Sequence, residues 1–310
     1  MNEGYPFIDR ENAWQQPVLI VPELGPWQLF AGKQPDSIDF DSVFMQGEGA
    51  GRFALPYEPG VRLYYGFRSA PLQTVLAEQH LPTQGAYNIR DLGGLRTQDG
   101  SMVAWGKLFR SDDLMNLTPT DLAYLAGIPL VTAIDFRTQN EISWAPDKLP
   151  DTVRHHYYYH IVPGGVDKDI SERQLQQEGG ASAFMRHIYC QLVVDKNIID
   201  TYRKFFKRIL EQDKQPLLFH CSAGKDRTGW AAALFYFALG VHTDDIFEDY
   251  MLSATYIEGK YPAGNERFTV KPSYLNAALS QVKESFGSMD KYLSEVLKID
   301  LKKLRSMFLQ

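Results

Sequence analysis

The chain has 310 residues, of which 44% are hydrophobic and 23% charged, and its formal net charge is −6. This length is enough for two domains, and the composition is that of an ordinary globular protein. The acidic balance argues against general nucleic-acid binding, which usually requires a basic surface. An anionic ligand would therefore have to be captured by local positive charge.

The N-terminus and the cysteines bear on the cellular compartment. Residues 1–16 are polar and lack the basic segment of a signal peptide, and the apolar run at 17–22 is too short to cross a membrane. Two cysteines, Cys190 and Cys221, do not make a disulfide framework. The sequence therefore predicts a cytoplasmic protein without a transmembrane segment, and secretion without a leader stays open.

The first 78 residues differ in pattern from the rest of the chain. Short β-prone runs with partial alternation are separated by Gly- and Pro-containing breaks, at the spacing expected of a small β-sandwich. The predicted strands are residues 17–21, 27–31, 37–44, 51–55 and 61–67. We predict an immunoglobulin-like or fibronectin-like sandwich over residues 1–78 and a second domain over residues 79–310, with a protein partner for the first domain left open.

The second domain is predicted to begin with a tight turn and a hairpin. Arg90 and Asp91 precede paired glycines, a pattern typical of a turn where backbones approach closely, and a hairpin turn is expected at residues 98–100. We expect Arg90 and Asp91 to brace a loop of the site from below. The alternative is a surface ion pair beside a turn.

A helix and a buried strand follow. Thr118 is the expected N-cap and Pro119 the first residue of a helix that ends at Gly127. Residues 131–137 then predict a parallel strand with Asp135 and Arg137 at its carboxyl end, where sites collect in open parallel sheets. These two residues are either at the edge of the site or an ion pair that holds loops.

Residues 155–161 contain three histidines but do not predict a metal site. Alternation along a strand sends the neighbours His155 and His156 to opposite faces, so the expected element is a half-buried strand. Whether the glycine-rich stretch at 162–180 forms a mobile lid is left open. The remaining pattern predicts a strand at 217–219 and helices at 181–194, 197–210, 230–239, 243–258, 272–286 and within 289–310.

The loop between the last strand and the charge-free helix carries the chemistry. Cys221 lies just before a helix N-terminus, whose partial positive charge favours the nucleophilic thiolate. The residues up to Arg227 can curl so that successive N–H groups form an anion-binding nest, and Gly224 permits the backbone angles this requires. Arg227 adds a planar fork for two phosphate oxygens. The sequence therefore predicts a binding site for a tetrahedral dianion, with the sulfur of Cys221 at the bottom of the site.

The ten residues from 220 to 229 read His-Cys-Ser-Ala-Gly-Lys-Asp-Arg-Thr-Gly. This string resembles the Cys-x5-Arg phosphate loop of bacterial cysteine-dependent protein-tyrosine phosphatases, in a branch that carries Lys and Asp inside the loop and includes phosphoinositide-active members. The Asn-x-Arg-Asp-Leu-Gly-Gly run at 88–94 and the Asp-Phe-Arg run at 135–137 are similar to motifs of the same branch. The resemblance implies a short, mostly parallel sheet flanked by helices, an α/β fold.

The resemblance also implies a role for each loop residue. Cys221 would attack phosphorus, and Arg227 with the loop N–H groups would hold the equatorial oxygens. Asp226 is the first candidate for the general acid and Asp135 the second. His220 would order the loop, Thr228 would hydrogen-bond the departing sulfur, and no metal or cofactor is needed. The expected phosphate-binding residues are Ser222, Ala223, Gly224, Lys225, Asp226 and Arg227.

A second aspartate resembles a general acid but is set aside. Trp144-Ala145-Pro146-Asp147 is similar to a Trp-Pro-Asp loop, yet an alanine intervenes and Asp147 lies far before Cys221 in the chain. The expected function is hydrolysis of phosphotyrosine in proteins, which releases inorganic phosphate. The alternatives are a phosphoinositide phosphatase, suggested by the cation of Lys225, an inactive phosphate-binding adaptor, and a sulfur-transfer or arsenate-reducing enzyme.

Overall fold

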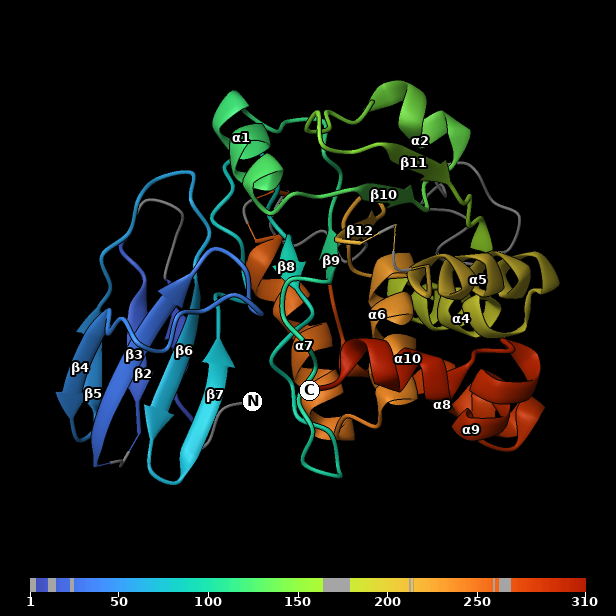
Figure 1. Ribbon diagram of the computed structural model, residues 1–310. Helices are drawn as coiled ribbons and strands as arrows, with labels where there is room; N and C mark the ends of the chain where they lie inside the picture. Colours follow the sequence, from blue (N-terminus) through green and yellow to red (C-terminus); the bar gives the residue numbers. More distant parts are fainter. Residues whose placement is uncertain are drawn as a thin grey trace.

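The computed structural model describes residues 4–10, 15–22, 25–163, 179–211, 213, 215–258, 260–261 and 269–310. The chain forms two parts that lie side by side, an all-β part from the N-terminal residues and a larger part of sheet and helices (Figure 1). Most of residues 162–180, where a lid was considered, lies outside the described residues.

The N-terminal part consists of two antiparallel sheets that share a buried core. One sheet has the strand order β1-β2-β5 and the other β4-β3-β6-β7. The strands are β1 (Phe7–Asp9), β2 (Val18–Val21), β3 (Pro26–Gly32), β4 (Met45–Glu48), β5 (Gly51–Ala54), β6 (Tyr64–Ser69) and β7 (Leu72–Leu76). Leu19 and Val21 from the first sheet pack with Trp27, Leu29 and Phe67 from the second.

One predicted strand of this part is wrong, and two strands were not predicted. Residues 37–44 form bends, and the strand of this region begins at Met45 instead. The reason is side-chain packing, because Phe40 turns back onto Phe30 with their ring centroids 5.1 Å apart. The strands β1 and β7 were not predicted. β1 is only three residues long, and β7 follows β6 after a turn of only two residues, so neither stands out in the sequence.

The second part is built on a five-stranded sheet with the order β11-β10-β12-β9-β8, parallel except for the β8–β9 pair. Its strands are β8 (Arg90–Asp91), β9 (Leu108–Ser111), β10 (Thr132–Asp135), β11 (His155–Tyr158) and β12 (Leu217–His220). His220 pairs with Asp135 on one side and Ser111 on the other. The carboxyl ends of three parallel strands therefore meet at the edge where Cys221 begins its loop.

Helices cover both faces of this sheet (Figure 1). Along β12 the side chains alternate, so Leu217 and Phe219 enter the large core with α4, α5 and α6, while Leu218 packs with the residues of α1. The helices are α1 (Pro119–Gly127), α2 (Gln139–Trp144), α4 (Ala181–Val194), α5 (Lys196–Ile209), α6 (Arg227–Leu239), α7 (Thr243–Tyr256), α8 (Pro272–Phe286), α9 (Met289–Lys291), the π-helical η4 (Tyr292–Val296) and α10 (Leu301–Phe308). Across the described ranges, none of them has the length and apolarity that a membrane crossing needs.

The two parts are joined by a buried ion pair and a small apolar cluster. Arg62 donates to Asp91 Oδ2 at 2.7 Å and to the Glu78 carbonyl at 3.1 Å, and the side chain of Asp91 is fully buried. Tyr64 and Ala77 pack with Met102 and Trp105 of the second part in one cluster. A core shared in this way predicts that both parts unfold together.

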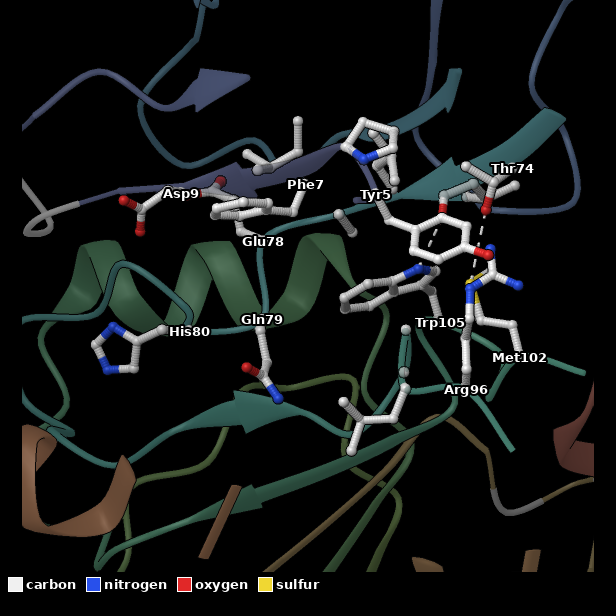
Figure 2. A pocket seen from close by; sticks show the side chains of 18 of the residues that line it. Tyr5, Phe7, Asp9, Thr74, Glu78, Gln79, His80, Arg96, Met102 and Trp105 are labelled. Carbon is white, nitrogen blue, oxygen red and sulfur yellow. Dashed lines mark hydrogen bonds between the residues drawn. The ribbon is translucent and has the colours of Figure 1, made fainter. Parts of the chain in front are cut away.

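A cavity of about 690 Å³ opens beside this junction. Figure 2 shows Asp9 and Glu78 along one wall, His80 and Gln79 below them, and Arg96 with Trp105 at the far end. His80 stacks on Tyr256, and burial lowers its pKa to about 4 although it bonds the Tyr87 carbonyl. The described lining includes no residue of the 220–229 loop, so this cavity is separate from the candidate active site.

The Arg62–Asp91 pair should dominate the stability of the junction. We expect Arg62→Ala to lower the free energy of unfolding by about 3–5 kcal/mol, because it leaves a buried carboxylate without its cation. Urea denaturation followed by circular dichroism measures the change. Arg52→Ala, at an exposed position of β5, should change it by no more than about 0.5 kcal/mol. Equal stability of the two variants would contradict the assignment.

Candidate active site

The loop from Cys221 to Asp226 is held from outside by its carbonyl groups. Each carbonyl accepts a hydrogen bond from a neighbouring element: Ser222 from the Asp113 N–H at 3.1 Å, Ala223 from Asn88 Nδ2 at 3.0 Å, and Gly224 from Arg110 Nη2 at 2.7 Å. Because these carbonyls face outward, the intervening peptide N–H groups turn inward. Among the described residues, the backbone N–H groups of 222–226 donate no hydrogen bond.

Gly224 is required at its position by both conformation and space. Its φ is +68°, in the left-handed region, and a Cβ there would lie 2.6 Å from the Ser111 carbonyl oxygen. This close approach is what brings the Gly224 carbonyl onto Arg110. The prediction that glycine permits the turn therefore has a concrete cause in the neighbouring end of β9.

Cys221 begins this loop directly after β12 and is 2% exposed. The hydroxyl of Thr228, in the first turn of α6, is buried and has no hydrogen-bond partner in the structure as described. An unpaired buried hydroxyl is unusual, because it costs about 1–3 kcal/mol. Such a hydroxyl is available to a sulfur atom or to a bound oxygen.

Arg227 is fixed by a carboxylate that sequence analysis missed. Glu141, in α2, accepts from Arg227 Nη1 at 2.7 Å and Nη2 at 2.6 Å, and also from the hydroxyl of Ser222. Burial alone would raise the pKa of Glu141, but the hydrogen bonds from Arg227 and Ser222 lower it to about 2. Since Glu141 occupies the two Nη groups end-on, the Nε–H side of the guanidinium is left for an anion. A signal existed in the capping box Thr138-x-x-Glu141.

Asp226 is held by two donors. Its Oδ1 accepts from the Tyr189 hydroxyl and from Lys225 Nζ, each at 2.9 Å, and its side chain stays 23% exposed. Burial, followed by the charge of Asp226, raises the pKa of Tyr189, so this phenol remains a donor. Tyr189 in turn lies 2.8 Å from the Tyr250 hydroxyl. Tyr189 belongs to α4 and was not predicted as a site residue.

Asp135 and Arg137 form a buried ion pair behind the loop. Both carboxylate oxygens of Asp135 accept from Arg137, and neither side chain is more than 1% exposed. Of the two alternatives predicted for this pair, the structure has the ion pair that holds loops. Arg137 also contacts Asp147 Oδ1 at 2.8 Å, so Asp147 is buried in the same network.

His220 lies in this network as well. Its Nε2 is 3.1 Å from Asp147 Oδ2 and 3.9 Å from Asp135 Oδ1, and its Nδ1 is 3.3 Å from the Cys221 carbonyl oxygen. Burial by itself would lower the pKa of His220, but the charges of Asp147 and Asp135 raise it to about 9.

Two predicted bracing residues lie elsewhere. Asp91 does not contact the loop, because its carboxylate accepts from Arg62 and from the N–H groups of Gly93 and Gly106. Arg90 reaches the loop only indirectly, since its Nε lies 3.8 Å from Asp249, which binds Arg110. The brace expected of this pair is supplied by Arg110, and the available signal was its position directly after Leu108 and Phe109 in a short β-prone segment.

Comparison with known proteins agrees with this geometry. The profile of the tyrosine phosphatase family matches residues 81–310. The chain therefore belongs to the tyrosine phosphatase family and is a protein-tyrosine phosphatase. The family region covers the described sheet, the loop after β12 and every helix that supports it, while the two N-terminal sheets precede it almost entirely.

Relatives from bacteria carry matching names. The H16_A0669 protein of Cupriavidus necator, named among the tyrosine-protein phosphatases, is 34% identical over 72% of this chain and 85% of its own. The triple specificity protein phosphatase PtpB of Mycobacterium tuberculosis is 26% identical over 71% of this chain and 94% of its own. Among solved structures, TpbA of P. aeruginosa aligns at 15% identity over 67% of this chain and 89% of that chain, with a TM-score of 0.31.

Glu141 should matter for turnover because it orients Arg227. We expect Glu141→Gln to lower kcat/KM for p-nitrophenyl phosphate by about 10²-fold, since a guanidinium displaced by 1 Å loses that much. Steady-state kinetics measures the effect. Glu211→Gln is the matched control, because Glu211 pairs with Arg208 on α5 in the same residue combination. An unchanged rate in Glu141→Gln would show that Arg227 needs no such support.

Proposed function

We propose that this protein hydrolyses phosphomonoesters through a covalent cysteinyl-phosphate on Cys221. The observation that carries the proposal is the row of backbone N–H groups at 222–226, which donate to no acceptor among the described residues and directly follow the buried Cys221 in the chain. Buried N–H groups are nearly always paired, so a set left open at a helix N-terminus is suited to an anion. Phosphate oxygens fit this arrangement.

In the first step, the thiolate of Cys221 attacks phosphorus and the ester oxygen leaves on the opposite side. The loop N–H groups and the free Nε side of Arg227 stabilise the three equatorial oxygens as charge develops on them. The S–P bond forms while the P–O bond to the leaving group breaks. In the second step, water attacks the same phosphorus, the S–P bond breaks, and inorganic phosphate and the thiolate are released. The buried hydroxyl of Thr228 would donate a hydrogen bond to this thiolate.

The general acid we propose is Asp226. It lies in the loop itself and remains partly exposed, whereas both oxygens of Asp135 accept from Arg137. Asp226 would protonate the leaving oxygen in the first step and take a proton from water in the second. Tyr189 and Lys225 keep its carboxyl aimed at the pocket. This geometry supports Asp226 over Asp135, which has no open lone pair facing a substrate.

Phosphotyrosine is the preferred substrate class in this proposal. Two relatives carry tyrosine-protein phosphatase names, and a third is named a triple specificity phosphatase. A phosphoinositide would need a free cation beside the pocket, but Lys225 Nζ is engaged by Asp226 at 2.8 Å. An inactive adaptor is disfavoured because it needs no sulfur, and arsenate reduction because it needs a second, resolving cysteine.

We propose that the chain divides into two domains at residue 78 and that the two domains are rigidly joined. Residues 1–78 would form a β-sandwich of immunoglobulin-like or fibronectin-like type, supported by the two antiparallel sheets around one core. The ion pair between Arg62 and Asp91 attaches this sandwich to the catalytic part. The sandwich therefore acts as a fixed extension of the catalytic domain. A protein partner for it remains a hypothesis without a contact surface to support it.

The nucleophile assignment is tested by Cys221→Ser. The wild type should hydrolyse p-nitrophenyl phosphate with a burst of p-nitrophenolate, and Cys221→Ser should show no turnover, because a serine hydroxyl is not ionised here. Cys190→Ser, at a partly buried position of α4, is the matched control and should retain the wild-type rate. An inert wild type would overturn the proposed enzyme, and an active Cys221→Ser would overturn the nucleophile.

The acid assignment is tested by comparing two leaving groups. Asp226→Asn should slow hydrolysis of phenyl phosphate by about 10²–10⁴-fold, but that of p-nitrophenyl phosphate much less, because p-nitrophenolate leaves without protonation. Rapid-mixing measurement of the first turnover isolates this step. Asp151→Asn, an exposed change of the same charge, should affect neither substrate. If Asp226→Asn slowed both substrates equally, Asp226 would not be the acid.

A further inference from the structure

A second cluster of polar side chains lies beneath the catalytic loop. It combines Asp135 at the end of β10, Asp147 between α2 and β11, His156 on β11 and His220 at the end of β12. One ligand atom from each side chain lies within 4.8 Å of all the others. The parallel neighbours β11, β10 and β12 bring these residues together, although they are far apart in the sequence.

Three of these atoms are buried without a hydrogen-bond partner. They are His156 Nε2, His220 Nε2 and Asp147 Oδ2, and the side chain of His220 is fully buried. Asp147 Oδ2 lies 3.1 Å from His220 Nε2 and 3.5 Å from His156 Nε2. The 3.1 Å between His220 Nε2 and Asp147 Oδ2 is short enough for a hydrogen bond, but the two groups do not have the angle that a hydrogen bond requires. Unpaired buried polar atoms are costly, and here three converge on one point.

The surrounding contacts leave these atoms available. The Nδ1 of His220 lies 3.3 Å from the Cys221 carbonyl oxygen, so a hydrogen on Nδ1 has an acceptor there, and a metal ion that displaced the proton of Nε2 would bind through the lone pair of Nε2. Arg137 and the Leu114 N–H occupy Asp147 Oδ1 and leave Oδ2 toward the imidazoles. A partner on the far side of each ligand is what orients metal-binding imidazoles and carboxylates in proteins.

We propose that His156, His220 and Asp147 form a binding site for a divalent transition metal ion, with Zn²⁺ as the best fit. Two imidazoles and a carboxylate are a ligand set typical of zinc, with bonds of about 2.0–2.2 Å. In a tetrahedron of such bonds the ligand atoms are about 3.3 Å apart. The two distances to Asp147 Oδ2, 3.1 and 3.5 Å, bracket this value. A water molecule would complete the set, because Asp135 Oδ1, 3.9 Å from His220 Nε2, already accepts two hydrogen bonds from Arg137.

The site would act through position and not through contact with substrate. His220 directly precedes Cys221, so an ion on its Nε2 would fix the end of β12 and, through Asp147, the segment between α2 and β11. The ion would also replace the arrangement in which a charged His220 pairs with Asp147 alone. That arrangement leaves His156 Nε2 with only the 3.5 Å contact to Asp147 Oδ2, which is too long for a hydrogen bond of ordinary geometry.

Co²⁺ titration of the metal-free chain provides the test. The experiment uses Cys221→Ser, so that the catalytic sulfur cannot bind the ion. Metal binding should give the intense visible absorption of tetrahedral Co²⁺, saturating at one equivalent and abolished by added Zn²⁺. The spectrum should lack sulfur-to-cobalt charge transfer, which would instead indicate Cys190.

Two histidines on the same strand supply matched variants. His156→Gln should lose the tetrahedral spectrum, whereas His155→Gln, which lies outside the cluster, should retain it. Circular dichroism and a cooperative thermal transition establish that each variant is folded. If His156→Gln does not fold, Asp147→Asn tests the site by removing a different ligand. Added Zn²⁺ should raise the unfolding temperature of the Cys221→Ser parent and of His155→Gln, but not that of His156→Gln or Asp147→Asn.

The parent titration decides whether the site exists. If folded Cys221→Ser gives no tetrahedral Co²⁺ spectrum, the proposal is overturned and the cluster is an ion pair between His220 and Asp147. It is equally overturned if His156→Gln and Asp147→Asn bind Co²⁺ as the parent does. Because these measurements do not use turnover, they are independent of the proposed phosphatase mechanism.

Discussion

The hydrogen bond from Arg110 to the Gly224 carbonyl is the contact on which the catalytic loop depends. Arg110 is fully buried, and Asp249 of α7 holds its other Nη at 2.7 Å. Burial and the neighbouring Arg90 lower the pKa of Arg110 to about 10, which still leaves it charged at neutral pH. A charged donor beneath the loop turns the carbonyl outward, and the adjacent N–H groups then face the inside of the loop.

Buried arginine–aspartate pairs recur around the same sheet edge. Arg62 and Asp91 connect the N-terminal sheets, and Arg137 gathers Asp135 and Asp147 behind the loop. Burying each ion pair costs free energy, and breaking it costs more because a buried charge is left unpaired. Each pair therefore favours a single arrangement of the strands and helices that carry it. The N-terminal part is therefore tied to the catalytic part by the same kind of interaction that shapes the phosphate site.

The two carboxylates nearest to Arg227 are given different roles by their surroundings. Glu141 is committed to the guanidinium of Arg227 and to the Ser222 hydroxyl, so it fixes the orientation of that guanidinium. Asp226 is held by Tyr189 and Lys225 and keeps part of its surface toward solvent. Neighbouring donors, not residue type, thus distinguish the carboxylate that is committed to Arg227 from the one that stays partly open to solvent.

Local signals in the sequence determined the loop, its flanking strand and helix, and most helix boundaries, because these depend on residues close in the chain. Thr118, the N-cap that the sequence predicts, is an N-cap in the structure. The residues that support the loop were decided by the tertiary structure, since strand order brings together parts of the chain more than a hundred residues apart. Alternation alone separated His155 from His156, and it could not show that Asp147 and His220 would meet His156 in space.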